Sequence, residues 1–238
     1  MKEQKAVKEA FTELAPRYEV VLDDELKSLW GWSYQAYINL LVERTEISEG
    51  QKILDIATGT AMIPRKIIQK NIPGIQITGL DFTESMLLHG KRELSSSIFP
   101  DIISLICGDA MALPFAAESF DVIVTGLASH HMDISLFLKE IKRTIKKNGR
   151  LSMIDVGASP IWHLPVISGL VRVIAFVYFL FKENLTRAVA EATSVTNVLT
   201  AEEWQDILSE FGFQNIIIEE MPGRYKWIPS PYTIKAIY

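Results

Sequence analysis

The sequence is poor in the residues that build disulfides, metal sites and nucleic-acid surfaces. Its single cysteine, Cys107, has no partner for an internal disulfide, which fits a reducing compartment. Its histidines and cysteine do not fall at the spacing of a structural zinc site, so we expect no metal. With 24 basic residues, 29 acidic residues and a net charge of -5, the chain has no positive excess to follow a phosphate backbone. We therefore expect no nucleic-acid partner.

Long apolar segments are also scarce. The first ten residues, MKEQKAVKEA, lack the apolar core of a secretory signal, and we expect a cytoplasmic protein. Residues 161–181 have about the length of a membrane span, but Pro165, Ser168, Gly169 and Arg172 interrupt them. We predict no transmembrane span but a buried or lid helix. A more specific alternative is that this segment is an apolar cover over a substrate pocket and also touches a membrane surface.

Apolar periodicity divides the chain into a helical start and an alternating remainder. Residues 3–45 carry apolar side chains at three- and four-residue spacing, which predicts helices. From residue 51 short apolar runs alternate with helical patterns, which indicates a parallel sheet with right-handed crossovers covering both faces. The expected strands are residues 52–56, 75–80, 102–107, 120–125, 150–156, 214–219 and 232–237. The expected helices are residues 63–70, 84–94, 134–147 and 200–211, the last one starting with a capping-box pattern.

These elements predict one α/β fold, a doubly wound, mostly parallel seven-stranded sheet of the Rossmann-like kind. Met221-Pro222-Gly223 separates the last two strands, so they are expected to form an antiparallel pair. Residues 1–48 would form an N-terminal helical cap, and residues 49–238 the main domain. The apolar segment at about residues 157–199 lacks strand signals and would form an inserted helical lid.

The first expected strand runs into a turn of small residues, KILDIATGTA at 52–61. Small side chains let a backbone approach a ligand closely, and open parallel sheets bind ligands at the carboxyl ends of their strands. Asp81 ends the second strand, 22 positions after Gly59, where a carboxylate can accept hydrogen bonds from both hydroxyls of a ribose. The dinucleotide fingerprint is missing, since Gly59 is the only glycine between Gly50 and Gly74. This disfavours an NAD-dependent oxidoreductase.

Three motifs follow one another along the chain. They are LDIATGT at 54–60, the acidic strand end Asp81, and GDAMALPF at 108–115 with SFD at 119–121. In this order they resemble class I S-adenosylmethionine-dependent methyltransferases, especially the branch that contains the ubiquinone/menaquinone C-methyltransferases. FTELAPRYE at 11–19 resembles the N-terminal cap of that branch, with Tyr18 at its aromatic position. The resemblance implies the class I methyltransferase fold and S-adenosyl-L-methionine as cofactor.

The resemblance also implies a role for each matching residue. Gly59 and its neighbours would pack on the methionine part of the cofactor, with Asp55 organising the turn. Asp81 would hold the ribose hydroxyls, and Asp109 would accept a hydrogen bond from the adenine amino group, with the next two residues against the ring. The whole predicted cofactor site is Tyr18, Asp55, Ala57, Thr58, Gly59, Thr60, Asp81, Phe82, Met86, Asp109, Ala110, Met111, Thr125 and Gly126.

Ala61 departs from the family pattern, which usually has a third small glycine there. A positive φ at this position would cost alanine about 1 kcal/mol, whereas a helical φ would make alanine neutral or better. The departure therefore bears on the geometry of the turn.

After the fourth expected strand, TGLASHHMD places His130 and His131 on a loop that faces the ligand crevice. Imidazole titrates near neutrality, so either histidine could remove a proton from a methyl acceptor, and His131 is favoured. The alternative is that the pair only packs, or caps the helix beginning near Asp133.

The quinone branch generally has a different, asparagine-containing loop here, so the predicted acceptor is kept broad. We predict methyl transfer to oxygen, nitrogen or carbon of a small lipophilic or aromatic acceptor, with quinol C-methylation as the alternative. The alternative from another functional class is a protein that binds the cofactor without catalysis. A bulky lipophilic acceptor is favoured by aromatic residues that could equally form core, namely Trp162, Phe176, Tyr178, Phe179 and, in the cap, Trp30, Trp32 and Tyr34.

Overall fold

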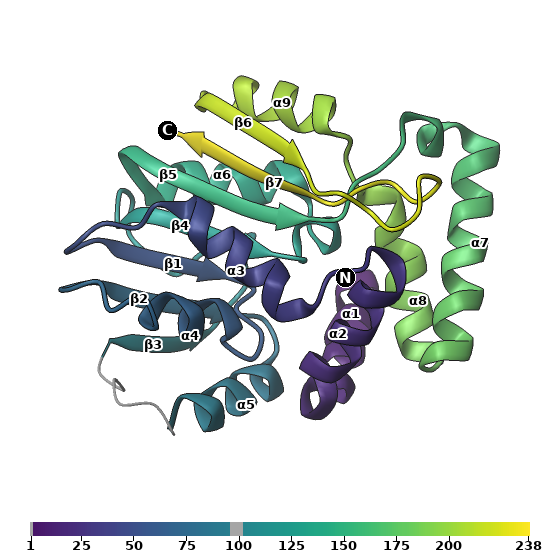
Figure 1. The fold of residues 1–238 in the computed structure, drawn as a ribbon, viewed down its shortest axis with the longest axis horizontal. Helices are drawn as coiled ribbons and strands as arrows, with labels where there is room; N and C mark the ends of the chain where they lie inside the picture. Colours follow the sequence, from purple (N-terminus) through teal and green to yellow (C-terminus); the bar gives the residue numbers. More distant parts are fainter. Residues whose placement is uncertain (1, 96–101) are drawn as a thin grey trace.

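A seven-stranded sheet runs between two layers of helices in the computed structural model, which describes residues 2–95 and 102–238 (Figure 1). The strand order is β3-β2-β1-β4-β5-β7-β6. The first five strands of this order pair in parallel, and β7 is antiparallel to both β5 and β6, as expected. The strands are β1 (Lys52–Ile56), β2 (Gln76–Asp81), β3 (Ile103–Cys107), β4 (Phe120–Gly126), β5 (Ile145–Asp155), β6 (Gln214–Glu220) and β7 (Tyr232–Ile237).

Successive strand residues point to opposite faces of the sheet, and each face has its own core. Ile53 and Val122 belong to the core under α3 and α4, whereas Leu54 and Ile123 belong to the core under α6 and α9. The helices are α1 (Lys2–Leu14), α2 (Tyr18–Leu29), α3 (Tyr34–Thr45), α4 (Met62–Ile68), α5 (Glu84–Ser95), α6 (Ile134–Thr144), α7 (Pro165–Lys182), α8 (Leu185–Ser194) and α9 (Ala201–Glu210).

The junction of α6 and β5 differs from the prediction. The helix expected over 134–147 ends at Thr144, and the strand expected from residue 150 already begins at Ile145. Ile145 pairs with Phe120 across an irregularity in the register, and Lys146 donates a 2.7 Å hydrogen bond to Asp121. Pairing with β4 therefore overrides the helical pattern of this short segment. The other predicted elements agree with the structure within one or two residues at each end.

The N-terminal helices are not a separate layer. Helix α3 lies on the sheet, and one continuous core joins Leu22 of α2 and Tyr37 of α3 to Ile53 and Val122 of the sheet. Helix α1 packs against α8 and α5, so it bridges the inserted segment and the main fold (Figure 1). The division into a cap of residues 1–48 and a domain of residues 49–238 stays a prediction.

Helix α7 lies at one edge of the molecule beside α8, away from the sheet (Figure 1). Of the two alternatives expected here, a buried helix is wrong, because α7, which is described over its whole length, contains no buried residue, and the lid stays a prediction. Among the described residues it is also the one helix whose length and composition would allow it to cross a membrane. The helix therefore covers the protein on one side only and exposes an apolar surface on the other.

Ala61 has a φ of 60°, in the left-handed region, and directly precedes α4. We therefore expect Ala61→Gly to raise the free energy of unfolding by about 1 kcal/mol, because glycine adopts this conformation without strain. A thermal melt should show an increase of about 2–4 °C in Tm. A lower Tm would mean that the buried methyl group of Ala61 contributes more by packing than the backbone loses by strain.

Candidate active site

A cleft opens at the carboxyl ends of β1, β2 and β4, and we call it the strand-end cleft. It lies where the strand order reverses, with β2 on one side of β1 and β4 on the other. Ten of the predicted cofactor residues line this cleft. They are Tyr18, Ala57, Gly59, Asp81, Phe82, Met86, Asp109, Ala110, Met111 and Gly126.

The other four predicted cofactor residues, Asp55, Thr58, Thr60 and Thr125, are buried and do not appear in the lining. Thr58 donates a 2.6 Å hydrogen bond to Asp55, and Thr60 donates one of 2.7 Å to Glu19. Burial raises the pKa of Asp55 to about 8, although the Thr58 hydrogen bond opposes this. The geometry therefore gives Asp55, Thr58 and Thr60 the role of holding the turn in shape.

Asp81 ties two loops of the strand-end cleft together. One carboxylate oxygen accepts a 2.8 Å hydrogen bond from the N–H of Gly59, and the other accepts one of 2.8 Å from the N–H of Thr83. The Thr83 hydroxyl donates a third hydrogen bond to this carboxylate, which leaves one of its about four lone-pair sites for a ligand. Burial raises the pKa of Asp81 even though all three hydrogen bonds favour the charged form. Gly59 has a φ of 55°, and an added Cβ there would lie at an ordinary contact distance of 3.7 Å from the Tyr18 ring, so the backbone conformation and not a lack of space favours glycine.

The sequence motifs alone did not predict the residues that cover the strand-end cleft. Val7 and Phe11 of α1 and Leu127 after β4 also line it. The three- and four-residue spacing of Val7, Phe11 and Leu14 was visible as the apolar face of a helix, but nothing local to α1 showed what that face would cover.

The two histidines lie on a short 3-10 turn, Ser129–His131, that follows β4. Nδ1 of His130 lies 2.8 Å from the carboxylate of Asp155, and the same carboxylate accepts hydrogen bonds from the N–H and hydroxyl of Ser129. Burial alone would lower the pKa of His130, but the adjacent Asp155 raises it. Asp155 therefore holds His130 in place.

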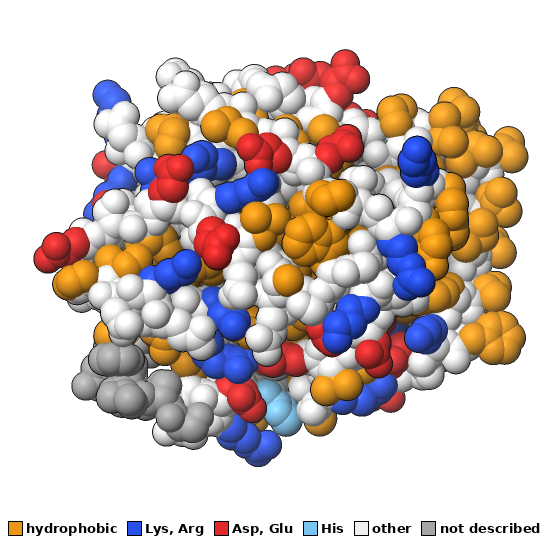
Figure 2. Space-filling model, viewed as in Figure 1, with side chains coloured by type: hydrophobic (Ala, Val, Ile, Leu, Met, Phe, Trp, Pro, Cys, Tyr) orange, Lys and Arg blue, Asp and Glu red, His pale blue; other side chains and the backbone are white. Residues whose placement is uncertain are grey.

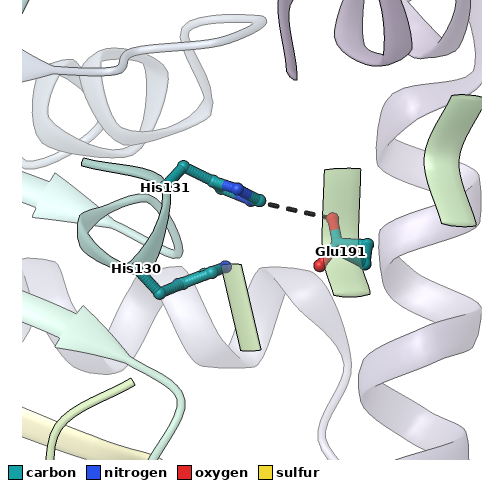
Figure 3. A group of neighbouring side chains, drawn as sticks. All are labelled: His130, His131 and Glu191. Carbon is teal, nitrogen blue, oxygen red and sulfur yellow. Dashed lines mark ion pairs between the residues drawn. The ribbon is translucent and has the colours of Figure 1, made fainter. Parts of the chain in front are cut away.

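His131 has a different environment. Its Nε2 lies 3.7 Å from Glu191 of α8 (Figure 3). Its ring meets that of Phe11 edge-on, with the ring centroids 5.3 Å apart. Among the described residues its Nδ1 has no hydrogen-bond partner. Burial, with smaller effects from His130 and Arg187, lowers the pKa of His131 well below its ordinary value. His131 is therefore neutral near pH 7 and able to accept a proton.

Next to the strand-end cleft lies a larger cavity of about 470 Å³, which we call the apolar cavity. Its walls come from α2, α7, α8 and the loop before β7, and include Leu26, Trp162, Tyr178, Phe179 and Trp227. Of the other aromatic residues expected near the acceptor, Trp30 lines the cavity, whereas Trp32, Tyr34 and Phe176 do not appear in its lining. The residues that line both cavities are Phe11, Tyr18, Leu127 and His131.

One wall of the apolar cavity is charged. Arg187 is buried there, 3.1 Å from Glu191 and 3.5 Å from Glu25, and its guanidinium lies 4.9 Å from the centre of the Phe11 ring. Burial raises the pKa of Glu25 to about 7, against the opposing effect of Arg187. Among the described residues, Nε and Nη1 of Arg187 have no hydrogen-bond partner. The cavity therefore offers donors and acceptors to one polar end of an otherwise apolar ligand.

His130, His131 and Glu191 could also be considered as metal ligands, since one possible ligand atom from each lies within 4.8 Å of the other two (Figure 3). However, the Arg187 guanidinium already neutralises Glu191, and a cation between these groups would face its positive charge. The absence of a metal stays a prediction, and loss of activity on adding a chelator would contradict it.

Comparison with known proteins decides the family. A model of the ubiE/COQ5 methyltransferase family matches residues 1–223. The chain belongs to this family. The UbiE ubiquinone/menaquinone biosynthesis C-methyltransferase of Geotalea uraniireducens is 30% identical over 231 residues, with 91% of this chain and 92% of the relative covered. The enzyme of the same name from Cereibacter sphaeroides is 31% identical over 151 residues, which cover 63% of this chain and only 58% of the relative.

The fold of this ubiE/COQ5 family member also has solved counterparts. A SAM-dependent methyltransferase from Aquifex aeolicus aligns with a TM-score of 0.62 at 16% identity, over 93% of this chain and 97% of the other. Family and fold together confirm the predicted class I methyltransferase fold, the enzyme class and S-adenosylmethionine as cofactor.

Proposed function

We propose that this protein transfers a methyl group from S-adenosylmethionine to a ring carbon of a lipophilic quinol-like acceptor in the cytoplasm. The observation that carries the proposal is the position of His131, a neutral buried histidine shared by the strand-end cleft and the apolar cavity. The names of the relatives, C-methyltransferases of ubiquinone and menaquinone biosynthesis, support carbon as the methylated atom.

The strand-end cleft fits the cofactor by its pattern of hydrogen-bonding groups. Asp81 has one lone-pair site free, and rotation of the Thr83 hydroxyl would free a second one for the two ribose hydroxyls, while Gly59 would let the backbone come close to the ligand. Asp109, fixed by a 2.9 Å hydrogen bond from the N–H of Met111, can accept from the adenine amino group. Bound S-adenosylmethionine supplies an electrophilic methyl group, and the protein has to align the acceptor with it and exclude water.

The apolar cavity fits an aromatic acceptor with hydroxyl groups. His131 would take the proton of one hydroxyl, which raises the electron density on the ring carbon that receives the methyl group. That carbon would bond to the methyl group as the donor's methyl–sulfur bond breaks, and it would then lose its own hydrogen as a proton, which restores the aromatic ring. Arg187 and Glu25 would bind oxygen at the polar end of the acceptor, and Phe11 and Tyr18 would hold its ring against the strand-end cleft. A volume of about 470 Å³ is within the range of sites for ligands of this size.

The test is transfer of labelled methyl from S-adenosylmethionine to a short-chain, water-soluble quinol, with the product identified by mass spectrometry. Methylation of an oxygen atom would contradict the proposed acceptor atom. Cofactor binding without any transfer to quinols would contradict the proposed acceptor class.

Phe179→Asp should raise the KM for the short-chain quinol at least about tenfold, because it places a charge in the wall of the apolar cavity. The Kd for S-adenosylmethionine should stay within about twofold, since Phe179 does not line the strand-end cleft. Val177→Asp is the matched control, because Val177 lies two residues away on α7 and is 44% exposed. Equal KM values for the two variants would show that this side of α7 does not contact the acceptor.

A further inference from the structure

The outer surface of α7 is apolar over the whole length of the helix. Its exposed residues repeat at three- and four-residue spacing and so form one stripe along the helix. The side chain of Val166 is 83% exposed and that of Phe181 is 86% exposed, where a helix on a water-soluble surface would carry polar groups. The stripe consists of Val166, Leu170, Val173, Ile174, Val177, Leu180 and Phe181.

The apolar surface continues beyond the helix. Ile161 and Leu164 are more than half exposed just before α7, and Trp227, in the loop before β7, is 79% exposed. Figure 2 shows the same gathering of apolar side chains along the edge where α7 lies in Figure 1, with basic side chains beside it. Exposed apolar surface of this extent normally marks a site of contact with a protein or a membrane.

The two segments that form this edge carry charge of one sign, although Glu203 of α9 lies 3.3 Å from His163 beside them. Residues 156–182 and 221–238 contain no aspartate or glutamate, although the whole chain has a net charge of -5. They contain Arg172, Lys182 and, next to Trp227, Arg224 and Lys226. Within the described residues, none of these four forms an ion pair with a carboxylate. Cations beside an apolar surface match the anionic head groups of a bilayer.

We propose that α7 and the loop around Trp227 dock the protein on an anionic lipid bilayer, with the helix lying in the plane of the interface. We call the stripe on α7 together with Ile161, Leu164 and residues 224–227 the docking surface. The proposal rests on the proposed function in one respect, because it explains how a lipophilic acceptor reaches the apolar cavity. Ile174 and Trp227 belong both to the docking surface and to the lining of that cavity, so the bilayer side and the acceptor side are continuous.

A transmembrane position does not fit the connections of α7. At 1.5 Å per residue the helix is about 27 Å long, slightly shorter than the roughly 30 Å of a hydrocarbon core. Both of its ends return to the same globular fold, and it packs along α8, which carries Arg187 and Glu191. Its inner side, with Val171, Tyr178 and Phe179, lines the apolar cavity. The helix can therefore enter the interface only with its outer stripe.

The test is sedimentation of the full chain with vesicles, either of phosphatidylcholine alone or of phosphatidylcholine with phosphatidylglycerol. The wild type should bind both and prefer the anionic mixture. Val173→Asp/Phe181→Asp should lower the partition coefficient on both at least about tenfold, because two charges enter the stripe. Arg224→Ala/Lys226→Ala should weaken only the preference for the anionic mixture, because Arg172 and Lys182 remain.

The matched control is Leu88→Asp/Leu136→Asp, which changes two apolar residues that are about half exposed on α5 and α6. It should bind vesicles as the wild type does. Equal binding of wild type and Val173→Asp/Phe181→Asp, or no binding by the wild type, would overturn the proposal. So would sedimentation velocity showing a wild-type dimer that the stripe variant breaks into monomers, since a second copy would then cover the stripe.

Methylation assays distinguish the docking surface from the proposed function. Val173→Asp/Phe181→Asp should methylate a short-chain quinol in solution as the wild type does, but should lose at least about tenfold on a long-chain quinol in vesicles. Vesicle binding without methylation of either quinol would contradict the proposed function and leave the docking surface in place. Methylation of both quinols by both proteins at equal rates would contradict the docking surface alone.

Discussion

Replacement of His131 by alanine is expected to lower kcat at least about a hundredfold, with the Kd for S-adenosylmethionine within about threefold of the wild type. The reason is that His131 is a neutral base next to both cavities, whereas His130 is already engaged by Asp155. Steady-state kinetics with a short-chain quinol and calorimetry with the cofactor would measure the two effects separately.

The pH dependence gives an independent check on His131. A base works in its deprotonated form, so activity should be present above the pKa of His131 and lost as the pH falls through it. Burial lowers this pKa, and the acid limb of the wild type should therefore lie below the ordinary value of 6.5. The deficit of His131→Ala should shrink as the pH rises and the acceptor ionises by itself.

His163→Ala is the matched control, because His163 is exposed and pairs with Glu203 at 3.3 Å, and it should leave kcat unchanged. The same assay on His130→Ala separates the two neighbouring histidines. A loss of less than about threefold at every pH for His131→Ala would give His131 a packing role only.

Asp81→Ala should weaken the binding of S-adenosylmethionine by roughly 1.5–3 kcal/mol, or about 10- to 150-fold in Kd. The variant loses the acceptors for two ribose hydroxyls, and also the hydrogen bonds that tie the N–H groups of Gly59 and Thr83 together. Because burial raises the pKa of Asp81, its carboxylate takes up a proton at a higher pH than an exposed aspartate does. On acidification, the affinity for the cofactor should therefore begin to fall at a higher pH than it would with an exposed aspartate. Calorimetry over a pH series would show both effects.

Asp121→Ala controls for the loss of an aspartate that supports the sheet. Asp121 also accepts a 2.8 Å hydrogen bond from a strand N–H, that of Lys52, but at the opposite ends of the strands. Its replacement should leave the cofactor Kd unchanged. Equal affinities of wild type and Asp81→Ala would remove Asp81 from the cofactor site, and nicotinamide nucleotides should give no comparable heat with either protein.

The fold could be predicted from the sequence where one local signal acts alone. The apolar strands β1 and β7 have the predicted bounds, and the capping box of Thr200 and Glu203 starts α9 where expected. The end of α6 could not be predicted, because residues 145–147 fit a helix locally and become a strand only through pairing with β4. Long-range pairing of this kind leaves no trace in a short stretch of sequence.

The candidate site shows the same division. Residues at or shortly after the end of a strand, such as Gly59, Asp81 and Asp109, lie in the strand-end cleft as their motifs suggested. Arg187 and Glu191 of α8 were not foreseen, because they reach the apolar cavity only through the packing of α8 on α1. A buried arginine within a helix looks like a solvated one in the sequence.

The two cavities are built by different parts of the chain, and this has a consequence for how such an enzyme can diversify. The strand-end cleft uses the ends of strands that the sheet itself requires, whereas most of the apolar cavity comes from α2, α7, α8 and the loop before β7. Changes in these peripheral segments can alter which molecule is methylated, while the strand-end cleft that would bind the cofactor stays unchanged. Exchanging residues 157–199 between relatives is therefore a direct way to engineer acceptor choice, with His131 as the fixed point around which the new pocket must be fitted.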